Sequence, residues 1–387
     1  MLVTAAFIGP GTLTVCTLSG ASMGFSLVWV LVVATFVTIL LQEMAARIGL
    51  VTQNGLGEAL RSNINQPFFR SSAILLVFTA IIIGNAAYEA GNISGAALGL
   101  EGIFGKSMSW PLLIGLVSLI ILSVGKTKVL ERILIGLVFT MSLVFIVTAV
   151  LAKPDIMSLA KGFIPSINSS NQLSVLALIG TTVVPYNLFL HASTIKNKWK
   201  NNSQLRDVRI ENSVAIILGG VISTAIVITS ASTIYGSDIS GMNEMAKQLE
   251  PLLGNWAKVF LTVGLFAAGV SSSITAPLAA AFTAKGIFGW SKGVTDPRFR
   301  IVWFVVLLSG VVISVGGFKP IRIIQVAQIA NGILLPIIVF FLLYLCNKRN
   351  LLGAYVNNTW QNALGILVIA MSLIISLRSL NSVFDFL

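Results

Sequence analysis

The stretch FIGPGTLTVC, residues 7–16, places a Gly-Pro-Gly sequence inside an apolar segment that otherwise resembles a membrane-spanning helix. Proline lacks a backbone N–H and interrupts the helical hydrogen bonds, and the bilayer core contains no water to satisfy the freed backbone groups. Such an interruption is tolerated where the irregular backbone is buried in protein or lines a cavity. The sequence therefore predicts that residues 8–12 lie inside the molecule and border a cavity.

A second interruption, TTVVPYN at residues 181–187, also combines proline with polar neighbours. The two interruptions fall in the first and the sixth predicted spans, five helices apart. Interruptions at corresponding positions of two halves indicate an inverted-repeat transporter with a binding site near the bilayer midplane. Either motif taken alone would be interpreted as a proline kink, and this remains the prediction for Pro277 and Pro336, which have no matched partners.

The composition is that of a polytopic membrane protein, since 56% of the 387 residues are hydrophobic and only 10% are charged. Apolar runs of about 17–25 residues recur along the chain, and each is long enough to cross a bilayer. We therefore expect an all-α fold. The predicted spans are residues 1–20, 24–48, 72–98, 109–124, 129–152, 173–194, 210–234, 257–288, 300–316, 320–346 and 361–379.

The basic residues predict membrane orientation rather than a nucleic-acid partner, although the formal net charge is +12. With a cytoplasmic N-terminus, the connections on the cytoplasmic side carry most of the 25 Lys and Arg residues. This asymmetry follows the positive-inside rule. We therefore expect a multi-pass protein with its N-terminus in the cytoplasm.

The connections between spans are too short to hold a soluble domain, so residues 1–387 are expected to form one transmembrane domain. Residues 1–152 would form the first inverted repeat, residues 170–346 the second, and residues 360–380 a peripheral eleventh helix. The sequence has no nucleotide-binding motif, and its single histidine does not permit a confident catalytic grouping. Neither enzymatic activity nor a cofactor is predicted.

Polar groups within spans are energetically expensive and are functional candidates. Glu89 is the one carboxylate that we place clearly within the membrane, and Gln328 lies in the tenth span. His191 follows the second interruption by about one helical turn. It is either a proton relay or a hydrogen-bonded interior histidine, and the sequence does not choose between them.

The sequence resembles the NRAMP family of divalent-metal transporters over nearly its whole length. Besides the two interruptions, the resemblance rests on GLVTQNGLGEAL (49–60), GKTKVLERI (125–133), VPYNLFLHAS (184–193), LGNWAKVFLTVGLFAAGVSSSITAPLAA (253–280) and NKRNLLG (347–353). The resemblance implies a LeuT-type fold of two inverted five-helix repeats. It also implies alternating access about two helices broken at the midplane.

The metal-binding residues of the family are replaced. The family pattern Asp-Pro-Gly-Asn reads Gly9-Pro10-Gly11-Thr12 here, and the family methionine of the sixth helix is Val184. Of the family pattern Asp-x-x-Glu in the third helix, only Glu89 remains. The family histidine and glutamine are retained as His191 and Gln328, so the resemblance leaves Glu89, His191 and Gln328 as candidates for proton or ion coupling.

These replacements predict a change of cargo. A divalent cation at the midplane needs negative charge and several strong ligands, which this site has lost. The helix that starts near Gly11 directs its amides and positive dipole end into the site, and Gly9 is expected to leave open space. A small anion fits these features, and we favour bicarbonate. The candidate substrate-binding residues are Gly9, Gly11, Thr12, Leu13, Thr181, Val184 and Tyr186.

Two other interpretations stay open. The first is a divalent-cation carrier of manganese, iron or magnesium type with altered selectivity, favoured by the family resemblance. The second is an intramembrane enzyme or a passive channel, against which the missing catalytic motifs and the paired interruptions argue. In either transporter interpretation we expect a monomer in the plasma membrane of a bacterium, with the lipid bilayer and a small inorganic ion as its partners.

Overall fold

The computed structural model describes residues 8–124, 128–290 and 293–384, and within these ranges its regular secondary structure is entirely helical. The opening residues of the first predicted span, and of the first predicted repeat, lie outside the described residues. The long helices are α2 (Pro10–Met23), α3 (Val28–Thr52), α5 (Pro67–Phe104), α6 (Ser109–Val124), α7 (Lys128–Leu151), α9 (Gln172–Thr182), α10 (Pro185–Lys198), α11 (Leu205–Thr233), α14 (Ala257–Phe288), α15 (Pro297–Val315), α16 (Pro320–Cys346) and α18 (Thr359–Phe384). Shorter helices connect them: α4 (Leu56–Asn63), α8 (Ile156–Lys161), α12 (Met242–Ala246), α13 (Glu250–Leu253) and α17 (Arg349–Leu352).

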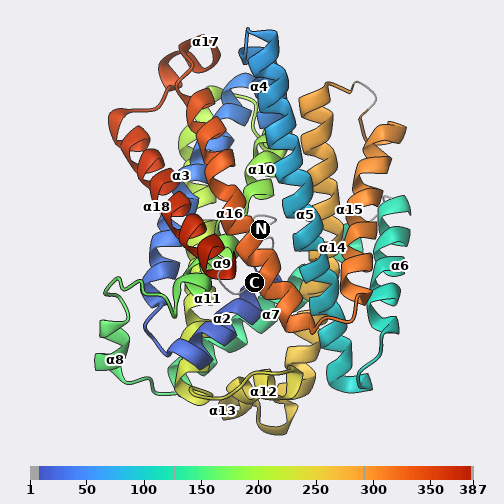
Figure 1. The fold of residues 1–387 in the computed structure, drawn as a ribbon, viewed down its shortest axis with the longest axis vertical. Coiled ribbons are helices and arrows are strands. Elements are labelled where there is room, and N and C mark those ends of the chain that lie inside the picture. The colour runs from blue at the N-terminus through green and yellow to red at the C-terminus, as the bar shows by residue number, and fades with distance from the viewer. Residues whose placement is uncertain (1–7, 125–127, 291–292, 385–387) are drawn as a thin grey trace.

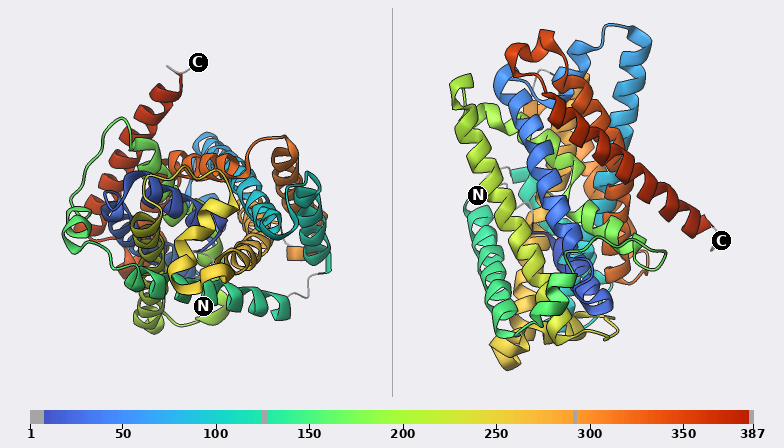
Figure 2. Two further views of the ribbon diagram at one scale, coloured as in Figure 1. Left: turned by 90° about the horizontal axis from the view of Figure 1, so that it is seen from below. Right: turned by 90° about the vertical axis from the view of Figure 1, so that its left-hand side faces the viewer.

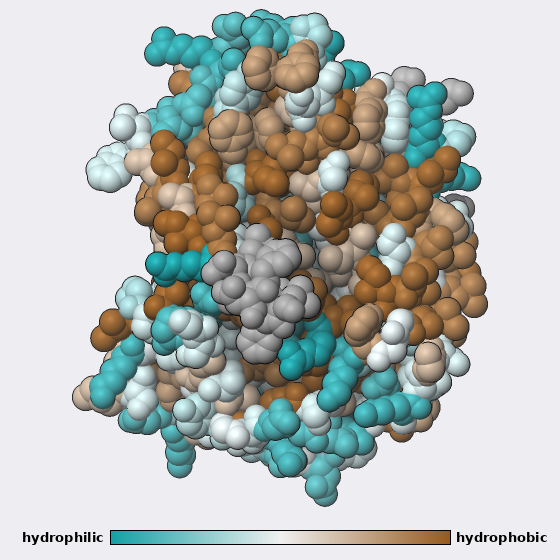
Figure 3. All heavy atoms as spheres, in the orientation of Figure 1, coloured by the Kyte–Doolittle hydropathy of each residue, from teal (hydrophilic) through white to brown (hydrophobic). Residues whose placement is uncertain are grey.

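Each predicted span coincides with one long helix, except the sixth, which is the pair α9 and α10. Among the described residues, nine helical segments are long and apolar enough to cross a membrane, and α2 and α6 are shorter. Figure 1 shows α4 and α17 at one end of the bundle and α8, α12 and α13 at the other. On the face drawn in Figure 3, hydrophobic residues form a band between more hydrophilic ends, as expected of a membrane protein.

The centre of the bundle is formed where α5 and α16 pack against each other and against α14, α9 and α2. α18 contacts α16, α9 and α3 and slants along the outside of the bundle (Figure 2). That residues 360–380 form a peripheral helix outside the two repeats stays a prediction. Pro277 lies inside α14 and Pro336 inside α16, so these prolines do not interrupt their helices.

Small residues let the helices approach the interruptions closely, as is usual in membrane bundles. A Cβ atom at Gly95 of α5 would overlap Pro10 at the start of α2. Similarly, a Cβ atom at Gly180 of α9 would overlap the backbone carbonyl of Gln328 in α16. The ring of Pro10 thus packs on the backbone of α5 at Gly95, and the backbone of α9 at Gly180 packs on that of α16.

Candidate functional site

The first interruption places the start of α2 in the interior of the protein. Gly9 precedes the helix in an extended conformation (φ −99°, ψ 179°), and its carbonyl accepts a hydrogen bond of 3.2 Å from the amide of Leu13. In the described part of the chain, no side chain caps this end and its first turn holds no acidic residue. The positive end of the helix dipole is therefore not neutralised by a carboxylate of α2 itself.

The second interruption separates α9 from α10 by the two residues Val183 and Val184. The amide of Val183 still donates to the carbonyl of Ile179 at 2.7 Å, and Pro185 then starts the new helix. The Thr182 hydroxyl donates back to the carbonyl of Leu178 at 2.8 Å. Thr182 therefore stabilises the end of α9 itself, as threonines at helix ends commonly do.

The two interruptions meet directly through a pair of threonines. The Oγ1 atoms of Thr12 and Thr181 lie 3.0 Å apart, and both residues are 1% exposed. The sequence analysis placed both residues in the same predicted site, and the structure brings them together there. Either hydroxyl can be the donor, so the pair links the two interrupted helices by a side-chain hydrogen bond.

The surroundings of Gly9 correct one sequence-based expectation. A Cβ atom at Gly9 would lie 3.2 Å from the Ser272 Oγ and 3.4 Å from the Tyr88 hydroxyl oxygen. A side chain at residue 9 would therefore meet two hydroxyl groups closely, so the space beside Gly9 is narrow and not open. Ser272 comes from α14 and Tyr88 from α5, so two other helices contribute to this end of α2.

Tyr186, a predicted substrate-binding residue, packs against Tyr88. The ring centroids lie 5.2 Å apart at an interplanar angle of 69°, an edge-to-face contact. Tyr186 therefore packs against Tyr88, and the hydroxyl of Tyr88 lies beside Gly9. The sequence analysis did not predict Tyr88 or Ser272. Two features of the sequence could have identified them: Tyr88 is next to Glu89, and Ser272 lies in a run of three serines at residues 271–273.

Gln328 lies beside the start of α2, because a Cβ atom at Gly11 would overlap its side-chain amide. Gln328 is 1% exposed, and its Oε1 has no hydrogen-bond partner among the described residues. A buried amide oxygen without a donor is destabilising by about 1–3 kcal/mol. The described residues therefore supply no donor to this oxygen.

Two other predicted substrate residues, Leu13 and Val184, have apolar side chains. The side chain of Leu13 is fully buried in the larger apolar cluster of the protein, and that of Val184 is 4% exposed within a second apolar cluster. Their side chains pack in the core. We assign no polar contact in the site to either residue.

The other two candidates for ion coupling, Glu89 and His191, do not contact the start of α2 or the Thr12–Thr181 pair in any contact described above. Glu89 is fully buried, accepts a hydrogen bond of 3.2 Å from Asn92 and packs against Gly310 of α15. The Nδ1 atom of His191 lies 2.7 Å from the Gln42 Oε1 of α3, which makes it a hydrogen-bonded interior histidine. Whether Glu89 or His191 moves a proton remains a prediction.

The resulting site is polar and neutral. It combines the start of α2 with the hydroxyls of Thr12, Thr181, Ser272 and Tyr88 and the amide of Gln328. Within the described ranges, His, Cys, Asp and Glu side chains do not form a group of three or more that would suit a metal ion. Such an arrangement can donate several hydrogen bonds and has no charge of its own to balance a cation.

The sequence profile of the family described as "Natural resistance-associated macrophage protein-like" matches residues 1–382. The divalent metal cation transporter MntH of Pectobacterium carotovorum is 27% identical over 379 residues, covering 94% of this chain and 89% of that protein. MntH of Klebsiella pneumoniae is 26% identical over 379 residues, with 94% and 88% covered.

Solved structures show the same fold. A crystallised variant of the Eremococcus coleocola manganese transporter superposes with a TM-score of 0.81 at 19% identity, over 98% of this chain and 85% of that one. A transporter of the nucleobase-cation-symport-1 family, solved in a closed conformation, gives a TM-score of 0.53 at 14% identity, over 97% and 89%. The fold is thus the LeuT-type fold expected from the sequence, and the chain belongs to the Nramp family of membrane transporters.

Proposed function

We propose that this transporter carries a small monovalent anion, bicarbonate, by alternating access about the two interrupted helices. The proposal rests on the charge of the central site. The start of α2 brings a dipole end equivalent to roughly half a positive charge, and the nearby polar side chains are neutral donors. An anion bound there accepts hydrogen bonds and is attracted by the dipole end. A divalent cation is repelled by the same dipole end.

The single observation that carries the choice of bicarbonate is the unpartnered Oε1 atom of Gln328 beside Gly11. A halide has no hydrogen to donate and would leave this oxygen unsatisfied. Bicarbonate has an O–H group that can donate to Gln328, and its other oxygens can accept from the hydroxyls of Thr12, Tyr88 and Ser272. Bicarbonate and the side chains of the site would then each have hydrogen-bond partners.

The second candidate is transport of a divalent metal cation, and the known relatives favour it over bicarbonate. The relatives described above are named for divalent metal cations or manganese, and none of them is named for an anion. Against this candidate stands the loss of the side-chain ligands at Gly9, Thr12 and Val184. A cation would have to be held by carbonyls and hydroxyls alone, with part of its water shell retained.

We further propose that the protein acts as a monomer in a bacterial plasma membrane with a cytoplasmic N-terminus, as the distribution of basic residues predicts. Coupling to a second ion would involve Glu89, His191 or Gln328. Gln328 differs from the other two because it already lies beside the proposed substrate.

Transport into proteoliposomes distinguishes the two candidates. Purified protein is reconstituted with an internal pH dye at about pH 8, where bicarbonate predominates over dissolved carbon dioxide, and labelled bicarbonate or manganese is added outside. We expect saturable bicarbonate uptake above that of protein-free liposomes, which control for diffusion of carbon dioxide. Saturable manganese uptake without bicarbonate uptake would overturn the anion proposal and establish the cation candidate.

A further inference from the structure

A groove lies between the start of α5 and the end of α16, at the end of the bundle that carries α4 and α17 (Figure 1). Its volume is about 490 Å³, which is within the range of small-molecule sites. One wall is the segment that joins α4 to α5 and the first turns of α5. The other wall is the last turns of α16.

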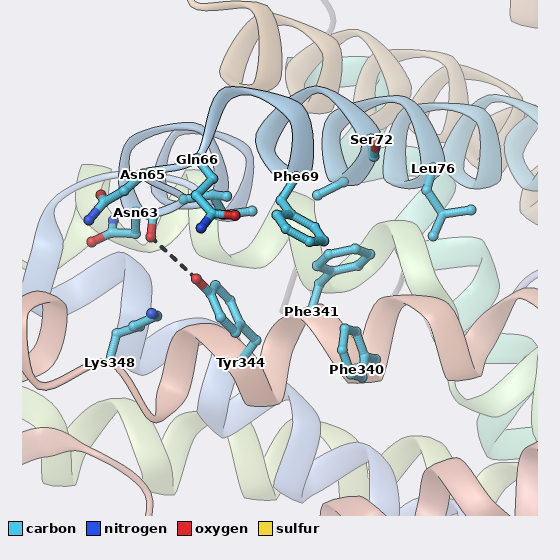
Figure 4. Close-up of a pocket in the computed structure, with 12 residues that line it drawn as sticks. Asn63, Asn65, Gln66, Phe69, Ser72, Leu76, Phe340, Phe341, Tyr344 and Lys348 are labelled. Carbon is cyan, nitrogen blue, oxygen red and sulfur yellow. Dashed lines mark hydrogen bonds between the residues drawn. The ribbon is translucent and has the colours of Figure 1, made fainter.

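The groove changes from polar to apolar along its length. Figure 4 shows Asn63 and Lys348 at one end and Leu76 at the other, with Phe69 and Phe341 facing each other between them. Phe69 is 61% exposed and Leu76 49% exposed, so the apolar part is open to the lipid. Residues 69 and 76 are seven apart on one helix, which spaces them about 10 Å along the helix axis.

The polar end carries a positive charge without a counter-charge. Lys348 holds its ammonium group 4.4 Å from the centre of the Tyr344 ring, and the Tyr344 hydroxyl donates to the carbonyl of Asn63 at 3.4 Å. Across the described residues, Lys348 forms no ion pair, and the side chains that line the groove include no carboxylate. Tyr344 therefore presents the cation toward the groove.

We propose that this groove binds one anionic phospholipid of the cytoplasmic leaflet. The phosphate lies at Lys348, and one acyl chain runs between Phe69 and Phe341 toward Leu76. The assignment rests on the proposed cytoplasmic N-terminus, which places the start of α5 at the inner leaflet, where anionic lipids and basic pockets meet. It does not depend on the cargo, since the groove is separate from the central site.

Native mass spectrometry of the purified, delipidated protein tests the proposal with added phosphatidylglycerol and phosphatidylcholine. We expect the wild type to retain phosphatidylglycerol in preference to phosphatidylcholine. Lys348→Ala should weaken phosphatidylglycerol binding about tenfold, and Lys348→Arg should keep it. Lys319→Ala is the matched control, because Lys319 lies at the opposite end of the same helix. Ser72→Trp leaves Lys348 in place but fills the groove, and it should also abolish retention.

Three results would overturn the proposal. Equal retention of both lipids by the wild type would show that the groove does not recognise the negative charge of the headgroup. Loss in Lys348→Ala with full retention in Ser72→Trp would mean that the lipid is held by surface charge and not by the groove. Displacement of the lipid by excess glycerol phosphate would make the ligand a soluble phosphate ester. Size-exclusion profiles and melting temperatures of the variants confirm folding, and the Lys348→Arg and Lys348→Ala pair decides the question if Ser72→Trp does not fold.

Discussion

The hydroxyl oxygens of Thr12 and Thr181 lie 3.0 Å apart, although the two residues are separated by 169 positions in the sequence. Each threonine belongs to one of the two interrupted helices. Alternating access in a LeuT-type fold requires these helices to move relative to their surroundings. A hydrogen bond that both helices share, at the place where a substrate would bind, is therefore a contact that binding can replace.

The first prediction concerns this pair. We expect Thr12→Val and Thr181→Val each to lower uptake by tenfold or more, since a hydrogen bond to a charged group contributes about 1.5–3 kcal/mol. The double variant should be less impaired than the product of the single effects, because the two hydroxyls act as one unit. Thr182→Val is the matched control, as its hydroxyl bonds within α9 and should leave uptake unchanged. Equal losses in all three variants would mean that the threonines act through helix stability.

The second prediction restores the family ligands. Gly9→Asp combined with Thr12→Asn and Val184→Met should create manganese binding that is at least tenfold tighter than in the wild type, a gain of about 1.4 kcal/mol. The new carboxylate would lie against the hydroxyls of Ser272 and Tyr88, which can donate to it. Titration calorimetry measures the affinity. A folded triple variant without detectable manganese binding would show that the site is assigned to the wrong residues.

The third prediction separates anion from cation transport with one substitution. Gln328→Glu adds a negative charge beside Gly11 at nearly constant volume. If the cargo is an anion, repulsion should reduce uptake strongly, whereas a cation carrier should bind its cargo more tightly. Parallel uptake assays with bicarbonate and manganese give the sign, and Gln172→Glu at the start of α9, outside the site, is the control for added charge. Raised bicarbonate uptake in Gln328→Glu would contradict the proposed role of Gln328.

The fourth prediction tests the packing that holds the first interruption. Gly95→Ala places a methyl group against Pro10, so α5 and α2 must separate, and the loss of stability should be about 1–3 kcal/mol. The apparent melting temperature in detergent should fall by several degrees. Gly136→Ala in α7 has free space around it and should be neutral or slightly stabilising. Equal melting temperatures of the two variants would argue against close packing at Pro10.

Much of the fold was predictable because the membrane restricts the chain to long apolar helices. The spans around Pro277 and Pro336 were predicted as kinked but continuous, and both are single helices. The meeting of Thr12 and Thr181 was predictable in kind, because the paired interruptions placed both residues in one site. The distance between them depends on how α2 and α9 pack against α5 and α16, which no local pattern encodes.

The sequence by itself determined the positions of the long apolar helices, the two interruptions and the absence of the family's carboxylate at Gly9, because hydrophobic length, proline and charge act locally. Only the tertiary structure decided what replaces that carboxylate. Ser272 and Tyr88 reach Gly9 from α14 and α5, and Gln328 reaches Gly11 from α16 with its oxygen unpartnered within the described residues. These residues are distant in sequence, and close packing at small residues brings them to the start of α2. The physical character of the site is thus a property of the packed helices.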